Sequence, residues 1–208
     1  MTETPTKTPL KVRLLQLALL ALVGTGIGLG IKYSRHYVIA KRFLEIEPGL
    51  FRSGQLKQWP YERVVETHGI KTVLRLNASE AASDPGFVIE DGVVAKHGLT
   101  LLHVPMKSGS GIVPFEQLDE AADYANDKSL RPMLLHCAAG DKRSSAVHGV
   151  WRMRHCGYTW EQTKKELLDF GLKAKATRLF DYLERYHNER ILGKPPSEVA
   201  PVGSKTKR

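Results

Sequence analysis

Cysteine is scarce in this chain, which has two among 208 residues. Cys137 and Cys156 lie at opposite ends of residues 143–156, whose pattern predicts a helix. At 1.5 Å per residue such a helix separates the two thiols by roughly 20 Å. A disulfide needs Cα atoms within about 7 Å of each other, so we expect two free thiols and no cross-link.

Acidic residues are rare at both ends of the chain. Residues 1–42 contain seven Lys or Arg against Glu3, and residues 191–208 contain four against Glu198. The segment between them, 43–190, holds 20 basic and 20 acidic residues, so the net charge of +9 belongs to the ends. A nucleic-acid-binding domain carries a basic face of its own. The balance argues against nucleic acid as a partner, and the length suits one domain with a substantial core.

Polar side chains are nearly absent from residues 14–31, where Gln16 and Thr25 are the only clear examples. Roughly 20 apolar residues span a bilayer as a helix, so this segment predicts a transmembrane helix that follows a basic N-terminal segment, 1–13. A cleaved signal peptide is the alternative, but the apolar stretch is long for one and no A-x-A site follows it. Basic residues flank both ends of the stretch, which leaves the side of the membrane open.

Glycine recurs at every second position from Gly24 to Gly30, which creates two overlapping G-x-x-x-G spacings. Such spacings let two membrane helices approach closely and would allow a homodimer through this helix, although glycine is also common in membrane helices generally. The same glycines resemble a dinucleotide fingerprint. No strand precedes them and no βαβ unit encloses them, which excludes that class of site.

Short apolar runs alternate with helical patterns over 43–190. Strands are predicted as buried runs at 71–76, 99–105 and 132–137. Helices are predicted at 60–68, about 85–97, 114–128, 143–156, 159–170 and 174–190. Thr159 suits an N-cap, and Gly157 and Gly171 suit helix ends. The alternation predicts an α/β domain with a mainly parallel sheet covered by helices, and the Pro-rich polar tail, 191–208, is predicted to be disordered.

Cys137 ends the predicted strand 132–137, and a helix begins about six residues later. In open α/β sheets, ligands bind beyond the carboxyl ends of the strands. The intervening loop is built mainly of small residues, Ala138, Ala139, Gly140, Asp141 and Lys142. Its successive N–H groups can therefore surround an anion, and Gly140 permits a positive φ. The helix N-terminus adds further free N–H groups and a positive dipole end.

Arg143 and Ser144 complete a phosphate-binding pattern. A guanidinium binds two phosphate oxygens at once, and such surroundings lower the pKa of a thiol below its free value of about 8.5. Cys137 is therefore predicted to be a thiolate that attacks phosphorus and forms a phosphocysteine, which water hydrolyses. The Ser144 hydroxyl would hydrogen-bond the sulfur and help it leave. A buried, inert cysteine at a strand end is the structural alternative.

The spacing His136-Cys137-x5-Arg143-Ser144 resembles the H-C-x5-R-[ST] signature of the protein tyrosine and dual-specificity phosphatase superfamily. GLFRSGQL, GIKTVLRLN and WRMRHCGYTWEQTKKEL are similar to segments of small bacterial dual-specificity-like phosphatases, and the resemblance covers about 43–190. It implies four or five strands with helices on both faces, Cys137 and Arg143 as the central pair, no metal and no cofactor. For an anchored chain it also implies the bacterial inner membrane.

An acidic residue is missing where such phosphatases usually place their general acid, on a mobile loop about thirty residues before the cysteine. The corresponding loop here, 105–115, contains no Asp or Glu. Asp141, within the nucleophile loop, is the first candidate, and capping of the helix N-terminus is its alternative role. Glu116 and Asp119, in the next predicted helix, are the second candidates. A more distant group, or no acid at all, remains the third interpretation.

Lys142 places a second cation at the rim of the loop. It would suit a substrate with more than one phosphate or an anionic lipid headgroup, and a solvated surface lysine explains it equally well.

The leading prediction is a membrane-anchored phosphatase of phosphotyrosine, phosphoserine or phosphothreonine proteins. A phosphoinositide or phospholipid-headgroup phosphatase, a non-catalytic phosphate-binding module and a rhodanese-like sulfur carrier are the alternatives. His136 and Cys156 are expected to be structural.

Overall fold

The computed structural model describes residues 9–78 and 84–195. Its strands are β1 (Leu44–Glu47), β2 (Leu50–Gly54), β3 (Thr72–Asn77), β4 (Thr100–Met106) and β5 (Met133–Cys137). Its helices are α1 (Leu10–Val38), α2 (Gln58–His68), α3 (Pro85–His97), α4 (Phe115–Asn126), α5 (Lys142–His155), α6 (Trp160–Asp169) and α7 (Thr177–Tyr186). A 3-10 turn, η1 (Lys128–Leu130), and a π turn, η2 (His187–Ile191), complete the described secondary structure.

The sheet has five strands in the order β1-β2-β5-β3-β4. β1 and β2 form an antiparallel pair, and the other neighbouring strands are parallel. The parallel strands end at one edge, where Gly54 of β2 lies beside Cys137 of β5 and Arg75 of β3 lies beside His136. The prediction of a mainly parallel sheet of four or five strands flanked by helices is confirmed.

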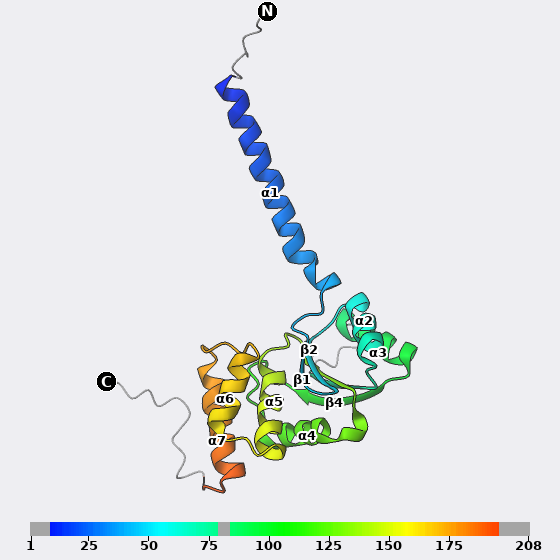
Figure 1. The fold of residues 1–208 in the computed structure, drawn as a ribbon, viewed down its shortest axis with the longest axis vertical. Coiled ribbons are helices and arrows are strands. Elements are labelled where there is room, and N and C mark those ends of the chain that lie inside the picture. The colour runs from blue at the N-terminus through cyan, green and yellow to red at the C-terminus, as the bar shows by residue number, and fades with distance from the viewer. Residues whose placement is uncertain (1–8, 79–83, 196–208) are drawn as a thin grey trace, which may run out of the picture.

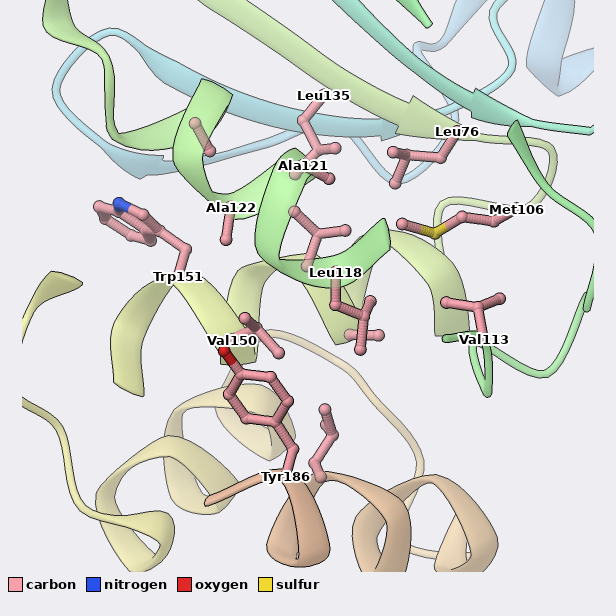
Figure 2. Packing of buried hydrophobic residues seen from close by; sticks show 14 of the residues in the cluster. Leu76, Met106, Val113, Leu118, Ala121, Ala122, Leu135, Val150, Trp151 and Tyr186 are labelled. Carbon is pink, nitrogen blue, oxygen red and sulfur yellow. The ribbon is translucent and has the colours of Figure 1, made fainter. Parts of the chain in front are cut away.

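Helices cover both faces of the sheet: α2 and α3 lie on one face, and α4 and α5 on the other, with α6 and α7 packed against α5 (Figure 1). Side chains of β5 alternate between the faces, because a strand repeats every two residues. Leu134 packs on the α2 side, whereas Leu135 and Cys137 belong to the larger core on the α5 side. Figure 2 shows Leu135, Leu118 of α4 and Val150 of α5 in that core. The alternation therefore turns the Cys137 side chain toward α5.

The start of α6 and the ends of α5 and α6 lie where the capping residues of the sequence predict them. The Thr159 hydroxyl accepts from the Gln162 N–H, and the Gln162 side chain accepts from the Thr159 N–H, which makes a capping box. Gly157 follows α5 with φ 70° and Gly171 follows α6 with φ 88°. Both glycines occupy left-handed conformations that favour a residue without a Cβ, and these helix-end predictions are confirmed.

Two predicted elements differ from the structure. The buried strand predicted at 99–105 is an edge strand, β4, whose Thr100, His103 and Pro105 are exposed. An edge position tolerates proline, which has no N–H for the ladder, and an apolar run does not reveal whether its strand is central. The helix predicted at 174–190 is shorter, because α7 ends at Tyr186 and the π turn η2 follows.

The apolar helix α1 extends beyond the predicted span 14–31 at both ends and covers 29 residues. Within the described ranges it is the one helix long and apolar enough to cross a membrane, with a mean hydropathy of 2.1 and none of that window buried. It projects away from the domain (Figure 1). A signal sequence near an N-terminus can meet the same criteria of length and hydropathy. The predicted basic segment 1–13 and the tail 191–208 lie largely outside the described residues.

Candidate active site

Cys137 lies at the end of β5 with 2% of its surface exposed. Its Sγ is 3.7 Å from the Ser144 Oγ. Burial raises the pKa of the Cys137 thiol, but the backbone N–H groups of Ser144 and Asp141, the Ser144 hydroxyl and the charge of Arg143 outweigh burial and lower that pKa. The predicted group of Cys137, Arg143 and Ser144 is thus brought together around one sulfur atom.

Gly140 allows the loop to pack tightly against the end of β2. Its φ is 66°, and a Cβ at this position would lie 2.3 Å from the backbone nitrogen of Gly54. Gly54 is equally restricted, because its own Cβ would lie 2.9 Å from the carbonyl oxygen of Ala139. The Gln55 N–H then donates to the Ala138 carbonyl at 3.3 Å. The positive φ predicted for Gly140 is confirmed. The close approach of the loop to the end of β2 requires glycine at both positions, 140 and 54.

Arg143 spans the carboxyl edge of the sheet. Its Nη1 donates to the Leu76 carbonyl at 3.3 Å and to the Met106 carbonyl at 3.2 Å, and these residues lie at the ends of β3 and β4. The two carbonyls fix the guanidinium in place while its other N–H groups have no partner among residues 9–78 and 84–195. Those N–H groups match the planar fork that binds phosphate oxygens.

Lys41 and Arg42, in the segment that joins α1 to β1, hold the outer side of the loop. Lys41 Nζ donates to the Ala138 carbonyl at 2.9 Å, and Arg42 Nη1 donates to the Ala139 carbonyl at 2.8 Å. In a trans peptide the next N–H points the opposite way, so these contacts direct the Ala139 and Gly140 N–H groups toward the anion position. Arg42 has φ 49°, a conformation that non-glycine residues seldom adopt. From the sequence alone, both residues were only part of the positive charge of residues 1–42.

Arg52 is a buried cation on β2, with 2% of its surface exposed. It donates to the Ser145 hydroxyl at 2.9 Å and to the Phe170 carbonyl at 2.9 Å. Burial lowers the pKa of Arg52 to about 10, although the charges of Cys137 and Asp141 oppose the change. The guanidinium therefore stays charged at neutral pH and favours an anion at the loop. The signal in the sequence is an arginine inside the short run LFRSG, which was not predicted as a strand and forms β2.

His136 belongs to a buried ion-pair cluster on the α2–α3 side of the sheet. Its Nε2 lies 2.8 Å from Glu90 Oε2, and Arg75 donates to the other carboxylate oxygen. Burial raises the pKa of Glu90, but His136 and Arg75 outweigh it and lower that pKa to about 2. Gln55 donates to Glu90 at 3.0 Å and to the Ala138 carbonyl through its backbone. His136 thus has the structural setting that was predicted for it.

Asp141 occupies the N-cap position of α5, but its side chain makes no capping hydrogen bond. Its Oδ2 lies 3.5 Å from Arg42 Nη1. Its backbone carbonyl accepts from the Ser145 N–H at 2.9 Å and from the Ser144 hydroxyl at 3.2 Å. The capping role considered for the carboxylate is therefore not observed, and Asp141 is the acid candidate that lies within the loop.

The second pair of acid candidates points elsewhere. Glu116 pairs with Arg190, and Asp119 accepts from the Tyr186 hydroxyl. Both partners lie in α7 or the turn after it, so the structure does not bring these two carboxylates to Cys137. Their contacts instead attach the start of α4 to the C-terminal helix.

The loop 105–115 packs against the start of α5. Gly111 has φ 82°, and a Cβ there would lie 2.9 Å from the Lys142 carbonyl oxygen. Ser108 and Ser110 share a hydrogen bond in the middle of this loop. The segment that carries a general acid in related enzymes thus reaches the nucleophile loop here with hydroxyl groups and no carboxylate. Lys142 itself is exposed at the rim.

The other cysteine has the opposite setting. Burial raises the pKa of the half-buried Cys156 thiol, and the 3.8 Å contact from Arg152 does not offset it. Both cysteines are free, as predicted. Over the described part of the chain no group of three or more His, Cys, Asp or Glu side chains could hold a metal ion.

Comparison with known families adds to this geometry. Residues 42–179 match the family described as DSP-PTPase phosphatase fused to NAD+ kinase. The chain belongs to this DSP-PTPase family. The predicted membership of the protein tyrosine and dual-specificity phosphatase superfamily is confirmed, and the match begins at Arg42, one of the residues that hold the loop. A search of curated proteins found no match.

Solved structures share the DSP-PTPase fold. The core catalytic domain of the PP-IP phosphatase SIW14 from S. cerevisiae is 18% identical with a TM-score of 0.59, covering 79% of this chain and 98% of that one. A mutant form of Tk-PTP is 18% identical with a TM-score of 0.56 and coverage of 70% and 96%. PTPMT1 in complex with PI(5)P is 14% identical with a TM-score of 0.54 and coverage of 72% and 96%. At these identities the likeness shows the fold.

Proposed function

We propose that this DSP-PTPase hydrolyses phosphomonoesters through a phosphocysteine on Cys137. The observation that carries the proposal is a buried thiol at the end of a parallel strand, with the Ser144 hydroxyl 3.7 Å from its sulfur. Backbone N–H groups at the start of α5 and the charge of Arg143 lower its pKa. The thiolate attacks phosphorus, an S–P bond forms, and the P–O bond to the leaving group breaks. Water then attacks the phosphocysteine and the sulfur leaves as a thiolate, stabilised by the same N–H groups and Ser144.

Asp141 is our proposed donor of the proton that the leaving oxygen takes. It is the candidate carboxylate that lies in the loop, at the N-cap position of α5, where its side chain makes no capping hydrogen bond. A general acid contributes about 10²–10⁴ in rate, most for poor leaving groups. Asp141→Asn should therefore remove the basic limb of the pH–rate profile for an alkyl phosphate. An unchanged limb would mean that another group, or water, supplies the proton.

The helix α1 is proposed to anchor the enzyme in the bacterial inner membrane as a single span.

The predicted substrate class, phosphorylated proteins, stays a prediction. A phosphoinositide or phospholipid headgroup is favoured by a specific observation, the direct contact of Lys41 and Arg42 with the nucleophile loop. Only three residues separate Arg42 from the end of α1 at Val38, which keeps the loop close to an anchored helix.

The test compares wild type, Cys137→Ser and Cys156→Ser on p-nitrophenyl phosphate. Wild type and Cys156→Ser should turn over substrate, and Cys137→Ser should lose about 10³-fold or more in kcat because the nucleophile is gone. If wild type binds vanadate or phosphate but hydrolyses nothing, the protein is a non-catalytic binding module. Phosphopeptides, phosphoinositides and phosphatidylglycerophosphate, offered in one panel, then identify the substrate class.

A further inference from the structure

A depression of about 240 Å³ adjoins the nucleophile loop on the side of α6 and α7. It is lined by Asp141, Lys142, Leu172, Lys173, Lys175 and Ala176. Pockets for whole drug-sized ligands measure about 300–1,000 Å³, so this one suits a single charged group. We call it the lysine depression.

The charges around the lysine depression are unbalanced. Three lysines, Lys142, Lys173 and Lys175, line it, and none of their ammonium groups lies within 4.0 Å of a carboxylate among the described residues. The one acidic side chain of the lining, Asp141, has the Arg42 guanidinium 3.5 Å away. Three cations at one concavity repel one another, and an anion bound among them relieves this repulsion, so the depression favours a group with several negative oxygens.

The turn that carries two of these lysines is firmly attached. Leu172 is buried, and its N–H donates to the Leu167 carbonyl at 2.9 Å. The Ala176 N–H donates to the Lys173 carbonyl at 2.9 Å, which closes the turn. Arg52 donates to the Phe170 carbonyl just before the turn. The buried arginine therefore ties the lysine depression to the same strand that supports the nucleophile loop.

We propose that the lysine depression binds a second phosphate of the substrate while the first lies over Cys137. The inference rests on the proposed phosphatase function and deepens it, because it limits the preferred substrates to molecules with two phosphate groups. Asp141 and Lys142 belong both to the nucleophile loop and to the depression, so the two phosphates lie on neighbouring parts of one substrate. A phospholipid headgroup with a terminal phosphate and a soluble bisphosphate share this chemistry.

The test uses the full chain in detergent micelles and a pair of double variants with equal loss of charge. Lys173→Ala/Lys175→Ala removes two cations from the depression. Lys71→Ala/Lys128→Ala is the control, because both residues are exposed and lie before β3 and β5, at the opposite edge of the sheet. The substrates are p-nitrophenyl phosphate, a soluble inositol bisphosphate, and a phosphatidylinositol monophosphate in vesicles.

The measured quantity is kcat/KM for each two-phosphate substrate divided by kcat/KM for p-nitrophenyl phosphate. Loss of two charge-assisted contacts should lower this ratio about tenfold or more in Lys173→Ala/Lys175→Ala, mainly through KM. The control pair should keep the wild-type ratio. A fall with the vesicle substrate alone identifies a lipid as the source of the second phosphate, and a fall with the inositol bisphosphate identifies a soluble ester. An unchanged ratio for both two-phosphate substrates would overturn the proposal.

A binding measurement distinguishes failure of the proposed catalytic function from failure of this inference. Binding of inositol bisphosphate and of inorganic phosphate is measured by calorimetry with Cys137→Ser as the background, where no turnover occurs. The lysine depression predicts tighter binding of the bisphosphate, lost in Lys173→Ala/Lys175→Ala. Equal affinity for both ligands would contradict it, whatever the activity of the wild type.

Discussion

The pKa of each thiol in this chain depends on the groups around its sulfur atom. Cys137 is the more buried of the two, and burial alone disfavours a thiolate. It is nevertheless the one whose pKa is lowered, because backbone N–H groups from the start of α5 reach its sulfur. Cys156 lies at the C-terminal end of the same helix, where free carbonyl groups and not N–H groups accumulate. The pKa of the Cys137 thiol is thus lowered by groups at the start of α5, whereas burial raises the pKa of Cys156 at its other end.

Replacement of Gly140 by alanine should impair the proposed phosphatase activity. The new Cβ would lie 2.3 Å from the Gly54 nitrogen at a residue with φ 66°, so the loop must move away from β2. We expect more than a tenfold loss in kcat and about 1–3 kcal/mol in the free energy of unfolding. Gly92→Ala in α3, where a Cβ meets nothing within 4 Å, should instead stabilise by about 0.5–1 kcal/mol. Wild-type kcat in Gly140→Ala would contradict this account of the loop.

Acidification should destabilise the protein through two buried groups. Burial lowers the pKa of His148 from 6.5 to about 4, against the opposing effect of Glu166. The unfolded state therefore takes up a proton between pH 6.5 and 4 that the native state does not, and stability falls as the pH falls through this range. Glu90, whose pKa is lowered from 4.5 to about 2, adds a second loss as the pH falls below 4.5.

Urea unfolding of wild type and His148→Gln at pH 7 and pH 4.5 measures the first of these effects. A shift of this size corresponds to about 3 kcal/mol when fully expressed. His148→Gln should show a smaller difference in unfolding free energy between the two pH values, because glutamine does not titrate. An equal difference in both proteins would show that His148 does not cause the loss.

At the scale of elements, the segment between α1 and β1 is part of the candidate active site. Lys41 and Arg42 hold the carbonyl groups of the nucleophile loop from outside, and Gly54 at the end of β2 fits between Lys41 and Ala139. β2 contributes Arg52 to the same region. The loop is thus supported by β2 and by the linker to α1, neither of which is adjacent to it in the sequence.

Removal of the linker cations should impair catalysis without unfolding the domain. In Lys41→Ala/Arg42→Ala the loop carbonyls lose charged donors, so we expect weaker vanadate binding and about a tenfold loss in kcat/KM. Iodoacetamide alkylation across pH should also give a higher pKa for Cys137. The charge-matched control is Lys71→Ala/Lys128→Ala, two exposed residues at the opposite edge of the sheet. Equal kinetics in the two double variants would mean that the linker does not position the loop.

At the scale of the whole molecule, charge and hydrophobicity are separated along the chain. The balanced catalytic domain joins an apolar helix of 29 residues, about 44 Å long at 1.5 Å per residue. That exceeds a hydrocarbon core of about 30 Å, so part of α1 extends beyond the bilayer if the helix spans it. The last turns of α1 also contact α2, which places the domain against the end of the helix.

The full chain should remain with membranes after a carbonate wash, whereas residues 39–208, which keep the linker, should be soluble. The physical reason is that α1 contains an apolar window with a mean hydropathy of 2.1. None of this window is buried against the domain, so its apolar surface favours the bilayer. Mass spectrometry of the mature protein distinguishes the alternative. A soluble product shortened from its N-terminus would establish a cleaved signal peptide in place of an anchor.

The sequence by itself determined the parts of the site that are consecutive in the chain. Cys137, Gly140 and Arg143 lie in one strand–loop–helix unit, so their spacing was enough to predict a thiolate beside an anion-binding loop. Helix ends at Thr159 and Gly171 were equally local. The physical reason is that caps, turns and loop N–H groups depend on residues a few positions apart, whose geometry the chain itself restricts.

Tertiary structure alone decided which distant residues support that loop. Arg42, Arg52, Glu90 and Lys173 are separated from Cys137 by between 36 and 95 positions, and no local pattern relates them to it. A parallel sheet brings the carboxyl ends of its strands to one edge whatever their separation in the chain. The strand order also places β4 at the edge of the sheet and β2 in its interior. Burial of Arg52 followed from that order, since a residue's surroundings depend on which strands become neighbours.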